Sequence, residues 1–324
     1  MAKLASAEMA EKKLATRAAF GATLAELAEE GVPVVAVDAD LTGSTTTKKF
    51  AAAAPENADK LFNCGIAEQN MIDVAAGLAL TGHVAYTGSF AVFGTGRAYD
   101  QIRNTVCYSN LDVKICPTHA GVSVGPDGGS HQMLEDVSLM RGLPNMRVLV
   151  PADYAAARAA IKLAAKTPGP VYVRMGRAAV PCVYDDDVEL ELGRAYVLRE
   201  GADATVVACG VEIREALAAA DALAAEGISI EVIDAFSVKP LDEDTITASV
   251  AKTGCCVVAE EHSVHGGLGS AVAECLARKN PAPCEFVGVQ DRFGKSGEFE
   301  ELLGYFNLDA ASIANAAKAA IARK

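Results

Sequence analysis

Clusters of lysine and arginine are missing from this sequence of 324 residues, in which 29 basic side chains are scattered among 42 acidic ones and the formal net charge is −13. A surface of this kind repels nucleic-acid phosphates and anionic lipid headgroups, so we expect neither nucleic acid nor a membrane as a partner. No apolar run approaches the roughly 20 residues that span a bilayer. Residues 1–13 also lack the basic-then-apolar layout of a signal peptide. We therefore expect a soluble, cytoplasmic protein.

Paired cysteine motifs are missing as well. The nine cysteines form no Cys-x-x-Cys pair and no metal-like spacing, and their number is odd. Disulfides are rare in a reducing compartment, and several of these cysteines lie inside apolar runs, such as residues 255–258. We expect most of them to be buried, reduced packing residues, and we predict no metal site in this chain.

Tryptophan is absent and alanine is abundant, and short apolar runs alternate with alanine-rich helical stretches. This rhythm favours an α/β fold over an all-β fold. Before residue 180, strands are expected at 32–38, 84–88, 113–116, 147–150 and 171–174, and helices at 8–30, 68–81, 96–106 and 155–166. Crossover helices between successive strands build parallel or mostly parallel sheets.

A segment with proline and three aspartates interrupts this rhythm after residue 180, which is typical of a linker. Beyond it, strands are expected at 205–209, 229–234, 255–260 and 285–289, and helices at 212–226 and 266–279. We therefore predict two open, mostly parallel-sheet α/β domains, at residues 1–180 and 195–324, joined by a linker at 181–194. A chain of this length can bury two medium-sized cores.

Candidate functional side chains lie where predicted strands end and helices begin, which is where open α/β sheets bind their ligands. Glu68 opens a helix after the small segment 63–67. It could equally be a helix-start carboxylate that the helix dipole favours. Phe90 and Phe93 follow the next predicted strand, and two rings at this spacing are often core residues. Neither position decides the function by itself.

The glycine-rich loop at residues 118–131 is harder to explain as a simple connection. It contains four glycines, which permit close backbone approach and positive φ. It also holds two of the five histidines, His119 and His131, with Asp127 between them. A connecting loop needs neither histidine, so this cluster predicts a site for a hydroxylated substrate.

Several ordered segments resemble motifs of the transketolase family. Residues 65–70, Gly-Ile-Ala-Glu-Gln-Asn, resemble its glutamate motif, and the likeness continues through residues 90–93, 127–132 and 144–146. The resemblance covers essentially the whole chain, the first part being similar to the pyrimidine-binding domain and the rest to the family's C-terminal domain. The family's Gly-Asp-Gly segment, which leads to an Asn that holds Mg²⁺ and the cofactor diphosphate, does not occur here.

The resemblance implies the C-terminal subunit of a split transketolase, a thiamine-diphosphate enzyme of the pentose phosphate pathway. Such an enzyme transfers a two-carbon ketol unit between sugar phosphates. The chain starts at Met1 and is expected to be a natural half. Its partner would be an N-terminal subunit that carries the diphosphate-binding domain and holds Mg²⁺. An α₂β₂ heterotetramer is expected, or a homodimer when the chain is alone.

The resemblance also assigns roles around the cofactor. Glu68 matches the catalytic glutamate that contacts N1′ of the aminopyrimidine ring. Phe93, with Phe90 nearby, matches the aromatic wall that packs on this ring. Asp40 and Leu41 match residues that lie near the cofactor.

Substrate-binding residues follow from the same comparison. Asp127 resembles a residue that recognises a substrate hydroxyl, and His131 resembles a catalytic residue that contacts the reacting hydroxyls. A ring of groups that hold the sugar phosphate is matched by Arg17, Ser44, His119 and Arg174. The guanidinium fork meets phosphate oxygens bidentately. By composition alone Arg17 would be a solvated helix residue, and Arg174, ranked first, competes with Arg177.

Three other functions stay open at this stage. Residues 65–69 and 97–101 also resemble deoxyxylulose-phosphate synthase, which normally carries both halves in one chain. The β subunit of a 2-oxoacid dehydrogenase is a separate half, but it has less reason to hold a sugar-phosphate ring. A regulatory or assembly subunit that kept the fold and lost the chemistry would not need Glu68 or the two loop histidines.

Overall fold

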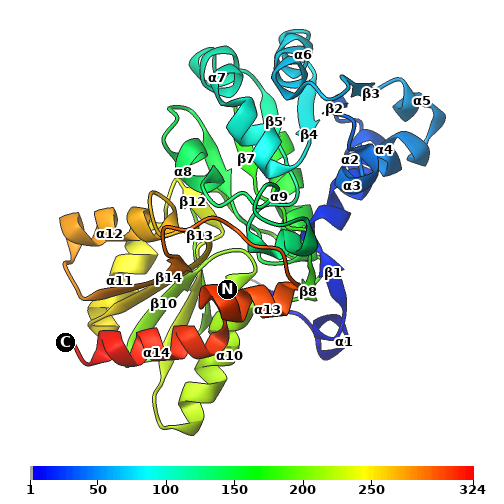
Figure 1. The fold of residues 1–324 in the computed structure, drawn as a ribbon. Helices are drawn as coiled ribbons and strands as arrows, with labels where there is room; N and C mark the ends of the chain where they lie inside the picture. Colours follow the sequence, from blue (N-terminus) through cyan, green and yellow to red (C-terminus); the bar gives the residue numbers. More distant parts are fainter. Residues whose placement is uncertain (1–2) are drawn as a thin grey trace.

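The computed structural model describes residues 3–324, which form two lobes around two large sheets (Figure 1). The larger sheet has seven strands in the order β12-β6-β7-β5-β4-β2-β3. Its strands are β2 (Val34–Asp38), β3 (Leu61–Asn63), β4 (Val84–Gly88), β5 (Val113–Ile115), β6 (Arg147–Leu149), β7 (Val171–Val173) and β12 (Ser237–Lys239). Neighbouring strands run parallel except β12, which pairs antiparallel with β6.

The second sheet has five strands in the order β14-β13-β10-β11-β9. These are β9 (Tyr196–Arg199), β10 (Ala204–Ala208), β11 (Ile230–Asp234), β13 (Cys256–Ser263) and β14 (Cys284–Val289). In this sheet β9 alone runs antiparallel to its neighbour. The predicted fold class, two mostly parallel α/β units, is therefore confirmed. Strand β12 belongs to the second half of the chain and yet completes the first sheet, so the two lobes share more than a connecting segment.

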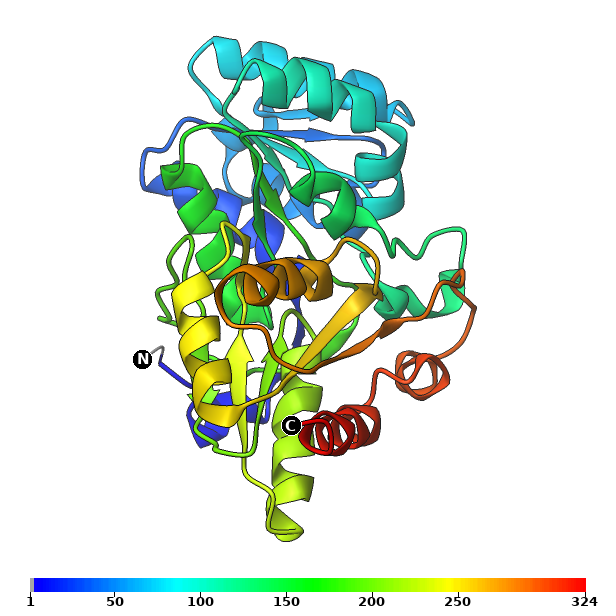
Figure 2. The same ribbon diagram turned by 90° about the vertical axis from the view of Figure 1, so that its left-hand side faces the viewer.

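Helices cover both faces of the larger sheet (Figures 1 and 2). On β2, Val34 and Ala36 pack in the same core as α2 (Ala19–Glu29) and α9 (Tyr154–Lys166). Val35 and Val37 instead share a core with α6 (Glu68–Leu80) and η3 (Ile102–Tyr108). Successive strand residues point to opposite faces, so a continuous apolar strand needs helices on both sides.

The second lobe repeats this layering. Helices α10 (Glu212–Ala225) and α14 (Ala310–Ile321) pack on one face of its sheet, and α11 (Glu243–Thr253) and α12 (Leu268–Lys279) pack on the other. The shorter elements are α1 (Ala7–Ala10), β1 (Lys13–Ala15), η1 (Thr16–Ala18), α3 (Thr42–Thr45), α4 (Thr47–Ala53), α5 (Pro55–Ala58), η2 (Val92–Arg97), α7 (Tyr99–Gln101), η4 (Val122–Asp127), α8 (Asp136–Arg141), β8 (Ala179–Pro181) and α13 (Phe299–Phe306). All nine cysteines are free, and seven of them are buried. Within residues 3–324, no helix has the length and apolar character needed to cross a membrane.

Two of the expected helices are wrong in part. The first half of the helix expected at 8–30 contains a single turn, α1, and strand β1, which pairs antiparallel with β8. Helical composition cannot reveal a strand partner that comes much later in the chain. Arg17 therefore lies in the turn η1 ahead of α2. The helix expected at 96–106 is divided among η2, α7 and η3.

The segment predicted as a linker is anchored in the core between the lobes. The Tyr184 amide donates to Asp153 Oδ2 at 2.8 Å, and the Tyr184 hydroxyl donates to Asp234 Oδ2 at 2.6 Å. All three side chains are fully buried, and burial raises the pKa of Asp234 to about 7. The segment between the lobes is therefore buried and hydrogen-bonded to both of them, and it is not a free linker. The exact domain limits at 180 and 195 stay a prediction.

Candidate active site

Parallel strands bring distant residues to one edge of the larger sheet. Asp40 follows the end of β2, Phe90 follows β4, His119 follows β5, and Arg177 follows β7, while Glu68 comes after β3. The carboxyl ends of parallel strands open onto the same edge, where sheets of this class bind ligands. Topology alone therefore gathers most of the predicted site residues.

Glu68 is the first residue of α6, and its side chain is only 2% exposed. Its Oε2 accepts a hydrogen bond from Arg97 Nη1 at 2.8 Å, and the same guanidinium lies 4.7 Å from the centre of the Phe93 ring. A carboxylate is favoured at a helix start, but a buried one also needs polar partners. Arg97 supplies such a partner. Apart from the likeness of residues 97–101 to deoxyxylulose-phosphate synthase, no pattern in the sequence marks Arg97, because an arginine on an expected helix normally lies in solvent.

Phe90 and Phe93 form a wall with the two histidines of the glycine-rich loop. Phe90 is stacked on His119, with 3.7 Å between ring centroids, and Phe93 meets His131 edge-on at 5.4 Å. The two phenylalanine rings are 6.2 Å apart and tilted by 15°. Phe90 is buried whereas Phe93 is half-buried. Phe93 is therefore the more accessible of the two rings, with the Arg97 guanidinium over it.

His119 is held in a buried position with an unusual backbone. Its φ is 61°, and its Nδ1 lies 2.7 Å from the Thr118 hydroxyl. Burial, reinforced by the charges of Arg17 and Arg177 and by His131, lowers the pKa of His119 to about 3. The imidazole is therefore neutral near neutral pH, and it can exchange hydrogen bonds with a hydroxyl without carrying charge.

Two arginines and one aspartate lie beside the loop. Arg17 donates from Nη1 to the Ser44 carbonyl oxygen at 2.9 Å, and Arg177 donates from Nη1 to the Val124 carbonyl oxygen at 3.0 Å. Burial lowers the pKa of Arg17, Arg177 lowers it further, and Asp127 opposes both effects. Both arginines are half-buried and repel each other. Such a pair of guanidinium groups favours an anionic ligand between them.

Arg174 does not join this group. Its side chain is 7% exposed, and its Nε and Nη2 donate to Asp136 at 2.7 and 3.2 Å. Nη2 also donates to the carbonyl oxygens of Glu261 at 2.9 Å and Met133 at 3.4 Å. The structure thus does not support ranking Arg174 above Arg177 as a sugar-phosphate residue. Two arginines three residues apart look alike in the sequence, and only the packing shows which one is already paired.

Asp40 and Leu41 form the turn after β2. Asp40 is exposed with φ 66°, and its amide donates to Asn63 Oδ1 at 3.0 Å. The Leu41 amide donates at 2.7 Å to Asp38 Oδ1, which lies in the core. The turn is therefore fixed from both sides. No group of three or more His, Cys, Asp or Glu side chains able to hold a metal occurs within residues 3–324.

Comparison with known proteins places this geometry in a family. The profile described as "Transketolase, pyrimidine binding domain" matches residues 12–183, and the profile described as "Transketolase, C-terminal domain" matches residues 193–313. A transketolase C-terminal section of Methanocaldococcus jannaschii is 46% identical over 301 residues, which is 92% of this chain and 93% of that protein.

Two further matches cover nearly the full length of both chains. A 6-deoxy-6-sulfo-D-fructose transketolase subunit of Clostridium sp. (strain MSTE9) is 42% identical, over 93% of this chain and 92% of its own. A solved structure described as a split gene transketolase, an inactive beta4 tetramer, superposes with a TM-score of 0.87. It is 48% identical and covers 96% of this chain and 99% of its own.

The low pKa of His119 can be tested without substrate or partner. Because burial and two neighbouring arginines disfavour the imidazolium, the His119 ring signals in an NMR titration should stay constant from about pH 8 down to about pH 4.5. The substitution His119→Gln assigns those signals by their disappearance. A His119 midpoint between about pH 5.5 and 7, near that of an unperturbed imidazole, would contradict the buried, charge-flanked position.

Proposed function

The chain belongs to the transketolase family, as the C-terminal subunit of a split enzyme, and we propose that it transfers a two-carbon ketol unit between sugar phosphates in the cytoplasm. The family depends on thiamine diphosphate. The observation that carries the proposal is the buried Glu68 carboxyl, joined to the Phe93 ring through Arg97, at the sheet edge where this class of fold binds ligands. A place in the pentose phosphate pathway follows from the substrate class.

Glu68 and Phe93 fit the aminopyrimidine end of thiamine diphosphate. A carboxyl in a site sheltered from water can hold or release a proton at the ring nitrogen N1′, and the half-buried Phe93 offers a flat apolar face to the ring. The fixed turn of Asp40 and Leu41 borders the same edge. When bound, thiamine diphosphate supplies the electron sink for cleaving and forming the carbon–carbon bond.

The residues around the glycine-rich loop fit a sugar with an anionic end. Arg17 and Arg177 would hold the phosphate, close to Ser44, in place of Arg174, whose guanidinium is already paired with Asp136. Neutral His119, with Asp127 and His131, would bind the sugar hydroxyls and orient them for proton transfer. The Clostridium relative is described as acting on a sulfonated sugar, whose end is also anionic. This supports an anion site, while the choice of a phosphate is ours.

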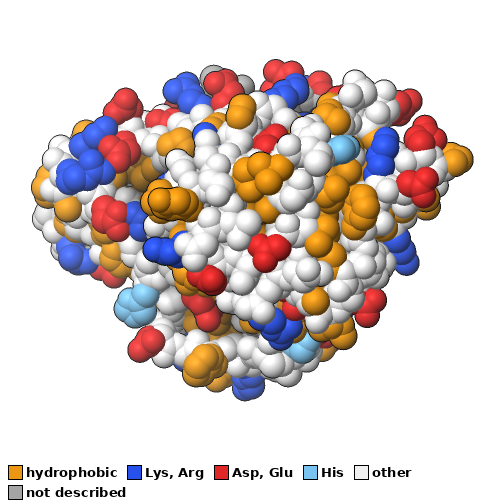
Figure 3. Space-filling model, turned by 90° about the horizontal axis from the view of Figure 1, so that it is seen from above, with side chains coloured by type: hydrophobic (Ala, Val, Ile, Leu, Met, Phe, Trp, Pro, Cys, Tyr) orange, Lys and Arg blue, Asp and Glu red, His pale blue; other side chains and the backbone are white. Residues whose placement is uncertain are grey.

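The other end of the cofactor would rest on a partner chain. This chain has no Gly-Asp-Gly segment for the diphosphate and Mg²⁺, so we propose an N-terminal subunit that holds both in an α₂β₂ assembly. The upper end of the molecule, seen from above in Figure 3, carries hydrophobic side chains among charged ones. Among the exposed apolar side chains of residues 3–324, Ile66, Leu80 and Tyr108 are 78, 73 and 88% exposed. Exposed apolar groups of this size favour burial against another chain, or against a second copy when the chain is alone.

Glu68→Gln tests the role of the carboxyl in the complex with the partner. Glutamine keeps the volume but cannot exchange a proton, so kcat should fall by roughly 10²–10⁴-fold, the usual contribution of a general acid–base group. Asp73→Asn removes an exposed carboxylate from the same helix and should leave kcat unchanged. A loss below about threefold for Glu68→Gln would mean that Glu68 serves only as a helix-start residue.

Arg177→Ala tests the substrate class. Loss of a charge-assisted hydrogen bond should raise KM for a ketose phosphate by about tenfold or more and change KM for an unphosphorylated ketose much less. Arg177→Lys keeps the charge but not the guanidinium fork, so its KM for the ketose phosphate should lie between those of the wild type and Arg177→Ala. Equal effects on both sugars would argue against a phosphate site here. A preference for pyruvate over ketose phosphates would favour the deoxyxylulose-phosphate synthase or 2-oxoacid dehydrogenase functions.

A further inference from the structure

The second lobe contacts the glycine-rich loop through a buried carboxyl. Glu261 lies near the end of β13 and is 3% exposed. Its Oε1 accepts the backbone N–H of Ser123, and its Oε2 lies 3.3 Å from the Ser123 hydroxyl oxygen, which donates to it. Burial raises the pKa of Glu261 to about 7, while Arg174 and the Ser123 hydrogen bonds oppose the rise. One side chain of the C-terminal lobe therefore binds the main chain of the proposed substrate loop.

The loop is shaped to let Glu261 approach. Gly121 has φ 78°, and a Cβ on this residue would overlap the Glu261 carboxyl. A side chain at position 121 would therefore be strained and would also displace Glu261. The Gly121 amide donates to the Met133 carbonyl oxygen at 2.8 Å, which joins the two ends of the loop.

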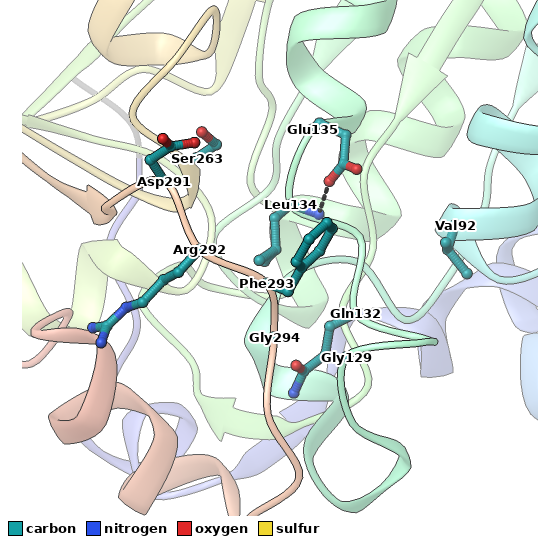
Figure 4. Close-up of a pocket in the computed structure, with 10 residues that line it drawn as sticks. All are labelled: Val92, Gly129, Gln132, Leu134, Glu135, Ser263, Asp291, Arg292, Phe293 and Gly294. Carbon is teal, nitrogen blue, oxygen red and sulfur yellow. Dashed lines mark hydrogen bonds between the residues drawn. The ribbon is translucent and has the colours of Figure 1, made fainter.

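A second contact with the C-terminal lobe lies further along the loop. Gln132 Nε2 donates to the Lys295 carbonyl oxygen at 2.9 Å, and the Lys295 amide donates to Gln132 Oε1 at 2.8 Å. Figure 4 shows Gln132 and Gly129 beside the segment that carries Gly294, and all three residues line a pocket. The glycine backbones at 129 and 294 are in such close contact that a Cβ on Gly129 would overlap Gly294.

The groups that the proposed function needs lie between these two contacts or next to them. Asp127 lies on the loop, His119 and His131 lie near its ends, and the Val124 carbonyl oxygen holds the Arg177 guanidinium. Any shift of residues 121–124 would therefore move Arg177 and the loop together. Arg174 links the same parts, since it donates to the main chain of both Met133 and Glu261.

We propose that Glu261 is a positioning residue for the sugar phosphate: through Ser123 it holds the loop of the first lobe in place, and this gives the C-terminal lobe a role in substrate binding. The inference rests on the proposed function for its substrate. It does not need Glu261 to touch the substrate or the cofactor. Glu261 binds the loop at Ser123, whereas the loop meets Phe93 at His131, near its other end, so cofactor binding should depend on Glu261 much less than substrate binding does.

The test compares Glu261→Gln and Glu261→Ala with Glu260→Gln in the complex with the N-terminal partner. Glu260 is a matched control, because it is the neighbouring buried carboxyl on β13 but accepts the amides of Leu268 and Gly269 at the start of α12. Glu261→Ala should raise KM for the sugar phosphate by about 10- to 100-fold, the cost of losing a hydrogen bond to a charged group. Glu261→Gln, whose amide oxygen can still accept, should raise it less.

The Kd for thiamine diphosphate should stay within about twofold in both Glu261 variants, because a local loop change spares the Glu68 side of the site. Glu260→Gln should leave both constants near wild type. Parallel loss of substrate and cofactor binding, or an equal rise of KM in Glu260→Gln, would reduce Glu261 to a general structural residue and overturn the proposal. An unchanged KM in Glu261→Ala would overturn it as well.

Hydrogen exchange on the chain itself separates this inference from the proposed function. Amides of residues 120–128 should exchange faster in Glu261→Gln than in wild type or Glu260→Gln, whatever the substrate is. If the wild-type complex transfers no ketol unit, the proposed function fails, and the exchange result still decides whether Glu261 holds the loop. Unchanged exchange of this segment in both Glu261 variants would contradict the positioning role.

Discussion

Arg174 is a buried, charged side chain, and the contact between the two lobes depends on how its charge is paired. Arg174 follows the end of β7 and pairs with Asp136 at the start of α8. The Oδ2 atom of Asp136 also accepts a hydrogen bond from the Tyr172 hydroxyl at 2.5 Å. Burial alone would raise the pKa of Asp136, but Arg174 and His262 outweigh it and the pKa is lowered. Such a pair adds little net stability, yet removing one partner leaves an unpaired buried charge at a cost of about 3–5 kcal/mol.

The paired Arg174 also joins the two lobes by hydrogen bonds that lie outside the sheets. The Arg174 guanidinium also binds the Glu261 carbonyl oxygen on β13 and the Met133 carbonyl oxygen at the end of the glycine-rich loop. Strand β12 joins the same lobes through the sheet, and Tyr184 joins them through Asp153 and Asp234. The carboxyl edge of the larger sheet is therefore lined on one side by its own strands and on the other by the second lobe. A rigid edge of this kind is what a site for a flexible sugar requires.

Much of this arrangement could be predicted from the sequence, and what could not has a physical reason. Strand 84–88 and the helix beginning at Glu68 agree with the structure because their apolar periodicity is local. Strands β1 and β12 could not be predicted, because each is only a few residues long and its partner strand lies far away in the chain. Among the site residues, Glu68, Phe93 and His119 all follow strands that end at one edge of the sheet, while the roles that the resemblance implies for them stay predictions. Arg174 differs from expectation because the environment of a side chain, not its spacing, decides whether it pairs inside the protein or stays available to a ligand.

We propose that this chain holds half of a shared active site. The most direct measurement is ketol transfer between sugar phosphates by the purified chain, alone and after addition of an N-terminal partner that carries the Gly-Asp-Gly segment, with thiamine diphosphate and Mg²⁺ present in both cases. We expect no measurable turnover by the chain alone and clear turnover by the mixture. Robust turnover by the isolated chain, or none from a mixture that forms a stable complex, would contradict it.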